Sequence, residues 1–421
     1  MLAPQPGQNR KFPRPIKIIS KDALAREWKL SRDATKNSGS KGVDNVSAAQ
    51  FAQKLDSNLD GLARSLREGK FGFSKLRAVF IPKPDSEKER VICVPTVKDR
   101  LVQRVISQYI TSKKVFPIYN SSSFGFIKGL GTREAINKVV TLRGKYQWCL
   151  KTDIESFFDK IPRPYLKNCV HKYLGVHSLT PLICNVIDTE AKITPQNKQK
   201  FAKQGIKTGL GVRQGMPLSP LLANLVLVDF DRAIAKNKLE MVRYADDLVL
   251  FFHSKDDAIS GQKIVAELLQ TLQLTIPQIA VNSKTNILSH ADPLIFLGRE
   301  IVYLDSIGTF VARVGNKQIS KIKLRINSEF SFAERSKKGD NFQDTLVDLS
   351  KSIAAYLGIY KDAYNFKQFE ADLRGQSRAV IVRLFEELFG QHALGSLSPA
   401  GRKFLGIEIL DKVEPNPELD V

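Results

Sequence analysis

Cysteine and histidine are scarce in this chain of 421 residues. The four cysteines are Cys93, Cys149, Cys169 and Cys184, and none forms a Cys-x-x-Cys pair. The five histidines show no spacing typical of metal ligands. Each cysteine lies in or beside an apolar stretch, which favours buried free thiols in a reducing compartment over disulfides.

Long apolar runs are missing as well. No stretch reaches the ~18 consecutive apolar residues of a membrane-spanning helix, and the N-terminus lacks the apolar centre of a signal peptide. No internal repeat is visible. We therefore expect a cytoplasmic protein without a membrane partner. Its length allows two or three domains, and a hydrophobic content of 43% supports real cores.

Acidic residues are in short supply relative to basic ones. Lysine plus arginine number 65 against 43 aspartates and glutamates, which gives a formal net charge of +22. Such an excess favours a polyanionic partner, and nucleic acid is the first candidate. A membrane surface is the rival, and a basic protein with no such partner is the plainer alternative.

The most informative acidic residues stand between two apolar runs, in Tyr244-Ala245-Asp246-Asp247. This pattern predicts a β-hairpin with the two carboxylates at its turn. Adjacent carboxylates repel each other and are costly to desolvate, and a divalent cation relieves both problems. Such a site suits two-metal phosphoryl transfer. The alternative is an acidic turn without chemistry.

A second acidic segment, residues 149–159, is predicted to be a strand that runs into a helix. Asp153 lies at the end of the strand, where its carboxylate can join the pair in the hairpin. The backbone carbonyl of Ile154 could supply another oxygen ligand. The ring of Phe158 could stack under an incoming sugar and clash with a 2′-hydroxyl, which would favour dNTPs. The alternative for Phe158 is a core position.

Two further segments carry candidate nucleotide contacts. Residues 213–225 are predicted to be a loop that feeds an apolar helix, with Ser219 as its cap and Pro220 in its first turn. In this loop Gly215 lets the backbone approach a nucleotide, and Gln214 can donate to it. In residues 81–92 a hairpin would present two cations, Lys83 and Arg90, to a triphosphate. The alternatives are an ordinary loop–helix junction for the first segment and ordinary surface basic residues for the second.

Beyond residue 315 the pattern becomes helical, and its first helix is amphipathic. Four apolar residues share one face: Ile319, Ile322, Ile326 and Phe330. Three basic residues lie on another face: Lys317, Lys321 and Arg325. The basic stripe is either a solvated surface or a track for a nucleic-acid backbone.

Together these segments resemble a reverse transcriptase of the bacterial group II intron-like kind, with its motifs in the family's order across residues 39–300. The motifs are IPKPDSEKERVICVPTVKDRLVQ, SSFGFIKGLGTREAI, LKTDIESFFDKI, RQGMPLSPLLANL, RYADDLVLF, VNSKTNIL and IFLGREI. The resemblance implies an α+β, right-hand polymerase fold with fingers, a palm built on a small antiparallel sheet, and a helical thumb. We expect an N-terminal extension over 1–75, fingers and palm over 76–305, and a thumb and tail over 306–421.

The resemblance also implies roles for particular residues. Two Mg²⁺ ions, or Mn²⁺ as a substitute, would be held by Asp153, Asp246, Asp247 and the carbonyl of Ile154. The dNTP would be bound by Lys83, Arg90, Gln214 and Gly215, with Phe158 as the sugar gate and Lys284 as the group that protonates the pyrophosphate or fixes the triphosphate. Residues 296–298 would grip the primer end, and residues 38–44 would cover the template.

The activity implied is that of an RNA-directed DNA polymerase, which adds dNTPs to a primer 3′ end. No cysteine follows Cys184, so we expect no Cys/His nuclease region, and the segments Asn-Ala-x-x-His and Val-Thr-Gly of retron enzymes are absent. These features favour a standalone, defence-associated enzyme that copies a locus-encoded noncoding RNA and acts against phage. The alternatives are an intron-type splicing cofactor and a template-independent or protein-primed polymerase, and the oligomeric state stays open.

Overall fold

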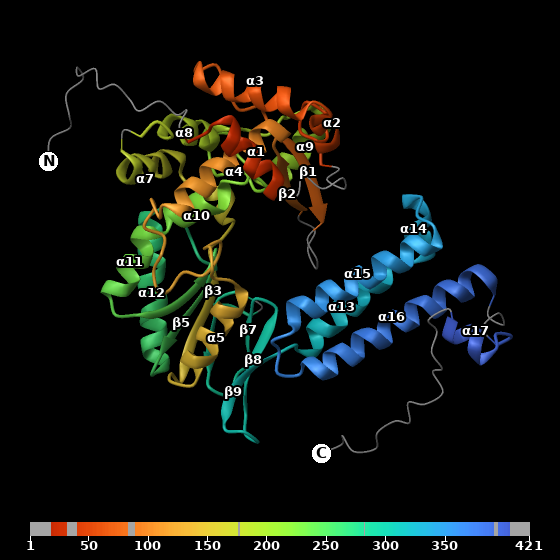
Figure 1. Ribbon diagram of the computed structural model, residues 1–421. Helices are drawn as coiled ribbons and strands as arrows, with labels where there is room; N and C mark the ends of the chain where they lie inside the picture. Colours follow the sequence, from red (N-terminus) through yellow and green to blue (C-terminus); the bar gives the residue numbers. More distant parts are fainter. Residues whose placement is uncertain are drawn as a thin grey trace, which may run out of the picture. The chain divides into compact units, whose positions relative to one another are not determined.

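The chain forms two compact units, residues 1–290 and 291–421 (Figure 1). The computed structural model describes residues 18–31, 40–82, 89–175, 177–281, 283–390 and 395–404, without the side chains of 402–404. The division falls after His290, ahead of the expected boundary at 305/306, because the strands that follow pair only with one another in the described chain. The three-part assignment stays a prediction.

The first unit opens with helices and a hairpin. The helices are α1 (Lys21–Leu30), α2 (Ala48–Gln53), α3 (Leu55–Arg67) and α4 (Val97–Ser112). Strands β1 (Arg77–Pro82) and β2 (Glu89–Val94) pair antiparallel and form the hairpin expected in residues 81–92. Lys54, at φ −124° and ψ 40°, separates α2 from α3.

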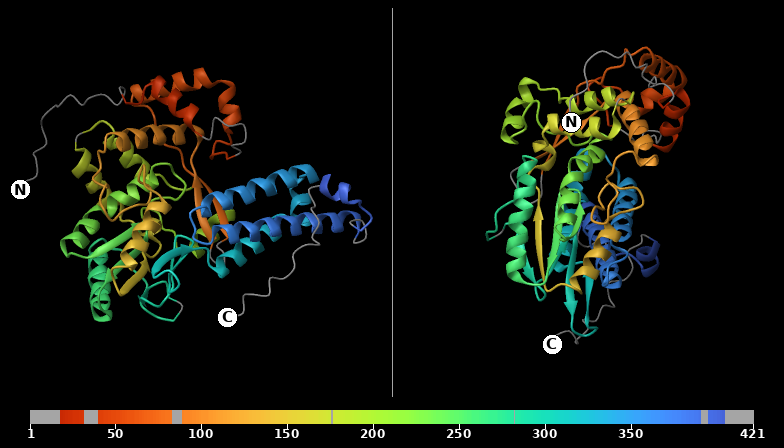
Figure 2. Two further views of the ribbon diagram at one scale, coloured as in Figure 1. Left: turned by 60° about the horizontal axis from the view of Figure 1, so that its bottom comes forward. Right: turned by 90° about the vertical axis from the view of Figure 1, so that its left-hand side faces the viewer.

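A four-stranded antiparallel sheet in the order β4-β5-β3-β6 forms the centre of the first unit. Its strands are β3 (Trp148–Asp153), β4 (Glu240–Tyr244), β5 (Asp247–Phe252) and β6 (Asn286–Ser289). Residues 248–252 of β5 are all buried, so both faces of this strand are covered. Helix α12 (Lys255–Thr271) packs on β3 and β5, and α5 (Thr132–Arg143) packs on β4 (Figure 2).

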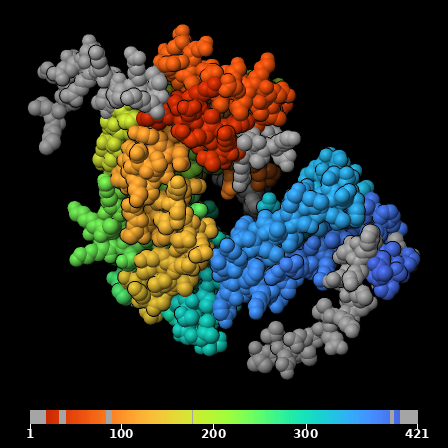
Figure 3. All heavy atoms as spheres, viewed as in Figure 1, coloured from red at the N-terminus to blue at the C-terminus, as the bar shows by residue number. Residues whose placement is uncertain are grey.

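Shorter helices complete the first unit: α6 (Phe157–Lys160), α7 (Arg163–Leu174), α8 (Thr180–Asp188), α9 (Pro195–Lys203), α10 (Ser219–Val226) and α11 (Val228–Lys236). One continuous apolar core joins them to the sheet through side chains such as Leu150, Phe157 and Leu222. In the space-filling view the orange-to-gold segment that includes α4 and α5 covers much of the visible face of this unit (Figure 3). The central sheet is therefore packed against helices within one apolar core.

The second unit has its own three-stranded antiparallel sheet of β7 (Leu294–Phe296), β8 (Arg299–Leu304) and β9 (Thr309–Arg313). Five helices follow in the described residues: α13 (Asn316–Glu329), α14 (Phe332–Lys338), α15 (Phe342–Tyr360), α16 (Phe366–Phe389) and α17 (Pro399–Phe404). The predicted face of Ile319, Ile322, Ile326 and Phe330 is buried, and Lys317, Lys321 and Arg325 are exposed. The helical and α+β predictions are confirmed, and no helix of the described chain is long and apolar enough to cross a membrane.

Candidate active site

The acidic hairpin is formed as predicted by β4 and β5. Tyr244 pairs with Asp247, and Ala245 and Asp246 make the two-residue turn between them. Ala245 has a left-handed backbone with φ +57°, as the tight hairpin turn requires at this position. The turn therefore fixes two consecutive carboxylates at one end of the sheet.

Asp153 meets this turn from the neighbouring strand. It is the last residue of β3 and stands opposite Asp247 in the antiparallel register. The backbone N–H of Ile154 donates to the carbonyl of Asp246 at 3.0 Å. The Ile154 carbonyl, which the sequence analysis offers as a further oxygen ligand, belongs to the residue directly after Asp153. Three carboxylates thus gather where the two strands end.

The electrostatics of the three carboxylates are those of a crowded, partly dry site. Burial, and then the negative charge of Asp153, raise the pKa of Asp246 above its ordinary value. One carboxylate oxygen of Asp153, Oδ1, is buried with no hydrogen-bond partner in the described residues. An orphaned carboxylate oxygen beside two other carboxylates fits a divalent cation, which prefers oxygen ligands.

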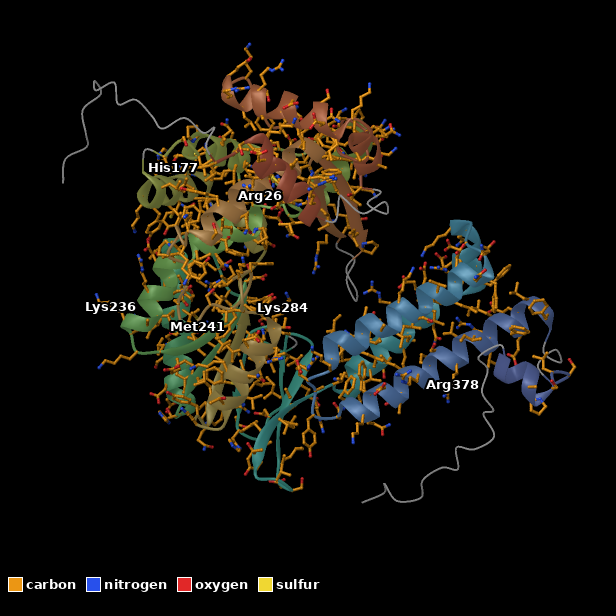
Figure 4. The ribbon with its side chains drawn as sticks, in the orientation of Figure 1. Arg26, His177, Lys236, Met241, Lys284 and Arg378 are labelled. Carbon is orange, nitrogen blue, oxygen red and sulfur yellow. The ribbon has the colours of Figure 1, made fainter. Side chains whose placement is uncertain are left out.

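Two lysines supply positive charge to the carboxylates. Lys284, which is 75% exposed, donates to Asp153 (Figure 4), and the mostly buried Lys151 donates to Asp247. Burial lowers the pKa of Lys151 to about 8. Within the described chain no group of three or more His, Cys, Asp or Glu side chains is arranged to hold a metal ion. Two of the carboxylates accept hydrogen bonds from lysines instead. A cation could be held by Asp153, Asp246, Asp247 and the Ile154 carbonyl after these lysines turn away.

A buried ionic cluster around Arg243 contacts the backbone of the acidic turn. Arg243 is fully buried and donates to both oxygens of Asp231, at 2.8 and 2.5 Å. It also donates to Asn224 Oδ1 at 3.0 Å, to Ser123 Oγ at 2.8 Å and to the Ala245 carbonyl at 3.1 Å. The sequence interpretation missed this cluster, although an arginine inside an otherwise apolar strand is a signal that it needs buried partners.

The predicted nucleotide loop is hydrogen-bonded to the hairpin of β1 and β2. The carbonyl of Gln214 accepts from the N–H of Cys93 on β2 at 2.7 Å. Gly215 has φ +103°, and a Cβ there would lie 2.6 Å from the Cys93 carbonyl. The predicted cap at Ser219 is wrong: Leu218 is the N-cap, and the Ser219 hydroxyl donates instead to the Arg213 carbonyl at 2.8 Å. Pro220 lies in the first turn of α10, as predicted.

Phe158 is the less buried member of an aromatic pair. Its ring lies 5.7 Å from the buried ring of Phe157, and only Phe158 is partly exposed. The Phe158 carbonyl accepts from Val212 at 2.7 Å, which joins the gate candidate to the nucleotide loop. Phe157 belongs to the apolar core and the partly buried Phe158 packs against it, so the sugar gate and the core position both stay open for Phe158.

The remaining candidates lie elsewhere in the chain. Arg90 is exposed on β2, opposite Ile81, in a different sheet from the carboxylates. Lys83 lies outside the described residues, as does the start of the predicted template loop. Residues 40–41 of that loop are held by Arg100 and Arg77, which donate to the carbonyls of Ser40 and Lys41. In the second unit, residues 297 and 298 form the turn between β7 and β8, both with positive φ.

Comparisons with known proteins identify the family of the chain. The model of the family described as "Reverse transcriptase (RNA-dependent DNA polymerase)" matches residues 81–301. The chain is 25% identical to the group II intron-encoded protein LtrA of Lactococcus lactis subsp. cremoris, over 51% of this chain and 34% of LtrA. It is 22% identical to the retron Ec83 reverse transcriptase of Escherichia coli, over 59% of this chain and 68% of that enzyme.

A solved structure titled as a partial Cas6-RT-Cas1–Cas2 complex aligns with a TM-score of 0.34 and 24% identity, over 61% of this chain and 41% of that chain. The match to LtrA, the first of these relatives, spans about a third of the length of LtrA. The family model, in contrast, covers more than half of the chain and includes all the carboxylates of the site. The chain therefore belongs to the reverse transcriptase (RNA-dependent DNA polymerase) family.

Proposed function

We propose that the chain is an RNA-directed DNA polymerase that adds dNTPs to a primer 3′ end. The observation that carries this proposal is the meeting of Asp153, Asp246 and Asp247 at the ends of β3 and β5, with one buried Asp153 oxygen left unpartnered in the described residues. Divalent cations, which we propose to be two Mg²⁺ ions with Mn²⁺ as a substitute, would activate the primer 3′-oxygen and stabilise the leaving pyrophosphate.

The protein's own residues would bind and orient the reactants. Gln214 and Gly215 would bind the dNTP, and the partly exposed ring of Phe158, whose carbonyl accepts from Val212, would act as the sugar gate. Arg90, together with Lys83, would hold the triphosphate. Lys284 reaches the carboxylates from an exposed position, so it is free to turn towards the pyrophosphate.

The proposed template is RNA, and the proposed setting is the cytoplasm. A net charge of +22 supports binding to a phosphate backbone. We further propose that the template is a noncoding RNA encoded at the same locus and that its copying serves antiphage defence. The likeness to LtrA, named as an intron-encoded protein, supports a second candidate, an intron-type splicing cofactor.

The test of polymerase activity is incorporation of dTTP on poly(rA) primed with oligo(dT), with Mg²⁺. Asp246→Asn should abolish incorporation and leave RNA binding by filter retention largely intact, because the substitution removes one charge without a change in volume. The matched control is Asp256→Asn, which changes an exposed carboxylate at the start of α12. Incorporation by Asp246→Asn at the rate of the control would sink the site assignment.

The biological template is tested by sequencing nucleic acid recovered with the tagged protein from its own locus, with and without phage infection. We expect one adjacent RNA and complementary DNA that appears only when Asp246 is intact. If RNA is recovered without DNA that depends on Asp246, the splicing candidate replaces the polymerase.

A further inference from the structure

Glu190, which follows α8, lies between two buried arginines. Its carboxylate accepts from Arg213 Nε and Nη2 at 3.1 and 2.7 Å, and Oε1 lies 2.7 Å from Arg163 Nη1. The same carboxylate accepts from the backbone N–H of Gly209 at 2.8 Å. Arg163 and Arg213 are 5% and 2% exposed. Burial opposes ionisation of Glu190, but its bonds to Gly209 and the arginines hold its pKa below the usual value.

The first arginine connects Glu190 to the Phe158 segment. Arg163 is the first residue of α7, and its Nε donates to the Gly211 carbonyl at 2.8 Å. Gly211 donates in turn to the Ile161 carbonyl at 2.9 Å. A Cβ at Gly211, which has φ +78°, would lie 2.6 Å from the Phe158 carbonyl. The loop and the gate candidate are therefore packed backbone to backbone.

The second arginine connects Glu190 to the nucleotide loop itself. Arg213 directly precedes Gln214, and its Nη2 also donates to the Lys207 carbonyl at 2.7 Å. Because Gln214 accepts from Cys93 on β2, a shift of Arg213 would move the loop away from the hairpin of β1 and β2. Because Nε and Nη2 of Arg213 both donate to Oε2 of Glu190, the contact restrains the orientation of the guanidinium group as well as its position.

The backbone of Glu190 is attached to the other strand of that hairpin. The Glu190 carbonyl accepts from Leu76 at 2.9 Å, and Lys192 donates to the Leu76 carbonyl at 2.7 Å. Leu76 directly precedes β1, the partner of the strand that carries Arg90. Glu190 is thus bonded, directly or through an arginine, to the Phe158 segment, to the Gln214–Gly215 loop and to the start of β1, which pairs with the strand that carries Arg90.

We propose that Glu190 is the positioning residue of the dNTP pocket, which holds the Phe158 segment, the Gln214–Gly215 loop and the start of β1 in one arrangement. This inference rests on the proposed use of dNTPs. Glu190 acts through Arg163 and Arg213 and needs no contact with the nucleotide. Loss of its charge would leave two buried guanidinium groups without their shared carboxylate, and the loop and the gate would lose their common anchor.

The test compares Glu190→Gln with Asp188→Asn, a matched control two residues away whose carboxylate is 49% exposed and pairs with Lys167. Both are assayed on primed poly(rA) with dTTP and with UTP. For Glu190→Gln we expect the KM for dTTP to rise about tenfold, with kcat within about twofold, because dNTP alignment is lost while the carboxylates are unchanged. We also expect the preference for dTTP over UTP to fall about tenfold.

Amide hydrogen exchange gives a readout that needs no catalysis. In Glu190→Gln, peptides that cover residues 207–218 and 157–163 should exchange faster, and in Asp188→Asn they should not. If Glu190→Gln does not fold, Arg213→Lys carries the same expectations, because lysine keeps the charge but has one nitrogen in place of the two that donate to Glu190.

Three results would overturn or separate the proposals. A folded variant with the KM and the sugar preference of the control refutes the positioning role. A fall in kcat alone, with unchanged KM and sugar preference, also refutes it, since it reports only a smaller active fraction. If the wild type itself incorporates no dTTP, the proposed function fails, and unchanged exchange in the loop and the gate then rejects the anchor as well.

Discussion

Replacement of Arg243 by methionine should destabilise the first unit by about 3–5 kcal/mol, the typical cost of removing one partner of a buried ion pair. Methionine keeps much of the apolar length of the side chain but none of its donors. Asp231, itself buried, would lose both bonds from Arg243 and retain the bond from Asn120 Nδ2 at 2.9 Å. The Ala245 carbonyl in the acidic turn would lose its bond from Arg243 as well. The variant should therefore lose both stability and activity.

Tryptophan fluorescence during a urea titration measures this loss in the right unit. The chain has two tryptophans, Trp28 on α1 and Trp148 on β3, and both lie in the first unit. This matters because a chain with two units need not unfold in one step. At a typical slope of about 2 kcal/mol per molar urea, the expected loss would move the midpoint down by about 2 M.

Two controls separate charge from packing. Arg232→Met removes an exposed arginine that contacts Asp229 and Tyr173, and should cost less than about 1 kcal/mol. The double variant Arg243→Met/Asp231→Leu removes both charges, so it should be more stable than Arg243→Met alone. A cost below about 1 kcal/mol for Arg243→Met, or a double variant no more stable than the single one, would refute the reasoning.

Two further predictions address the sugar gate and a buried carboxyl group. Phe158→Ala should raise the kcat/KM for rNTPs relative to dNTPs, because the ring that would exclude a 2′-hydroxyl is gone; an unaltered ratio would remove Phe158 as the gate. Burial raises the pKa of Asp99, so its contribution to stability is present below the unfolded pKa of about 4 and is lost as the pH rises through the folded pKa. Asp99→Asn should therefore stabilise the protein more at pH 7 than at pH 4 in urea titrations, and an equal effect at both would contradict the assignment.

The parts of the site that could be predicted are those set by local pattern. The hairpin follows from two apolar runs around a short acidic turn, and the position of Asp153 follows from the end of its own strand. The antiparallel register then places Asp153 opposite Asp247. The roles of these residues in metal and dNTP binding remain predictions. Their proximity, in contrast, follows from where the strands end and how the strands pair.

The parts that could not be predicted depend on partners far apart in the sequence. Arg243 bonds Ser123 across 120 positions, and Arg213 bonds Glu190 across 23. No periodicity links such pairs, because each partner comes from a different element. The wrong cap at Ser219 has the same origin: its hydroxyl is taken by the Arg213 carbonyl, a contact made by the folded loop rather than by the helix start.

The two arginine clusters share one physical arrangement. In each, a carboxylate binds a buried arginine next to a segment with a proposed role in the site: Asp231 binds Arg243 beside the acidic turn, and Glu190 binds Arg213 beside Gln214. A buried ion pair adds little net stability compared with apolar residues of the same volume, so stability alone does not account for either. Fixing the direction of a neighbouring backbone accounts for both. It follows that Arg243→Met/Asp231→Leu should recover stability without recovering DNA synthesis, since apolar packing restores the core but gives the Ala245 carbonyl no donor.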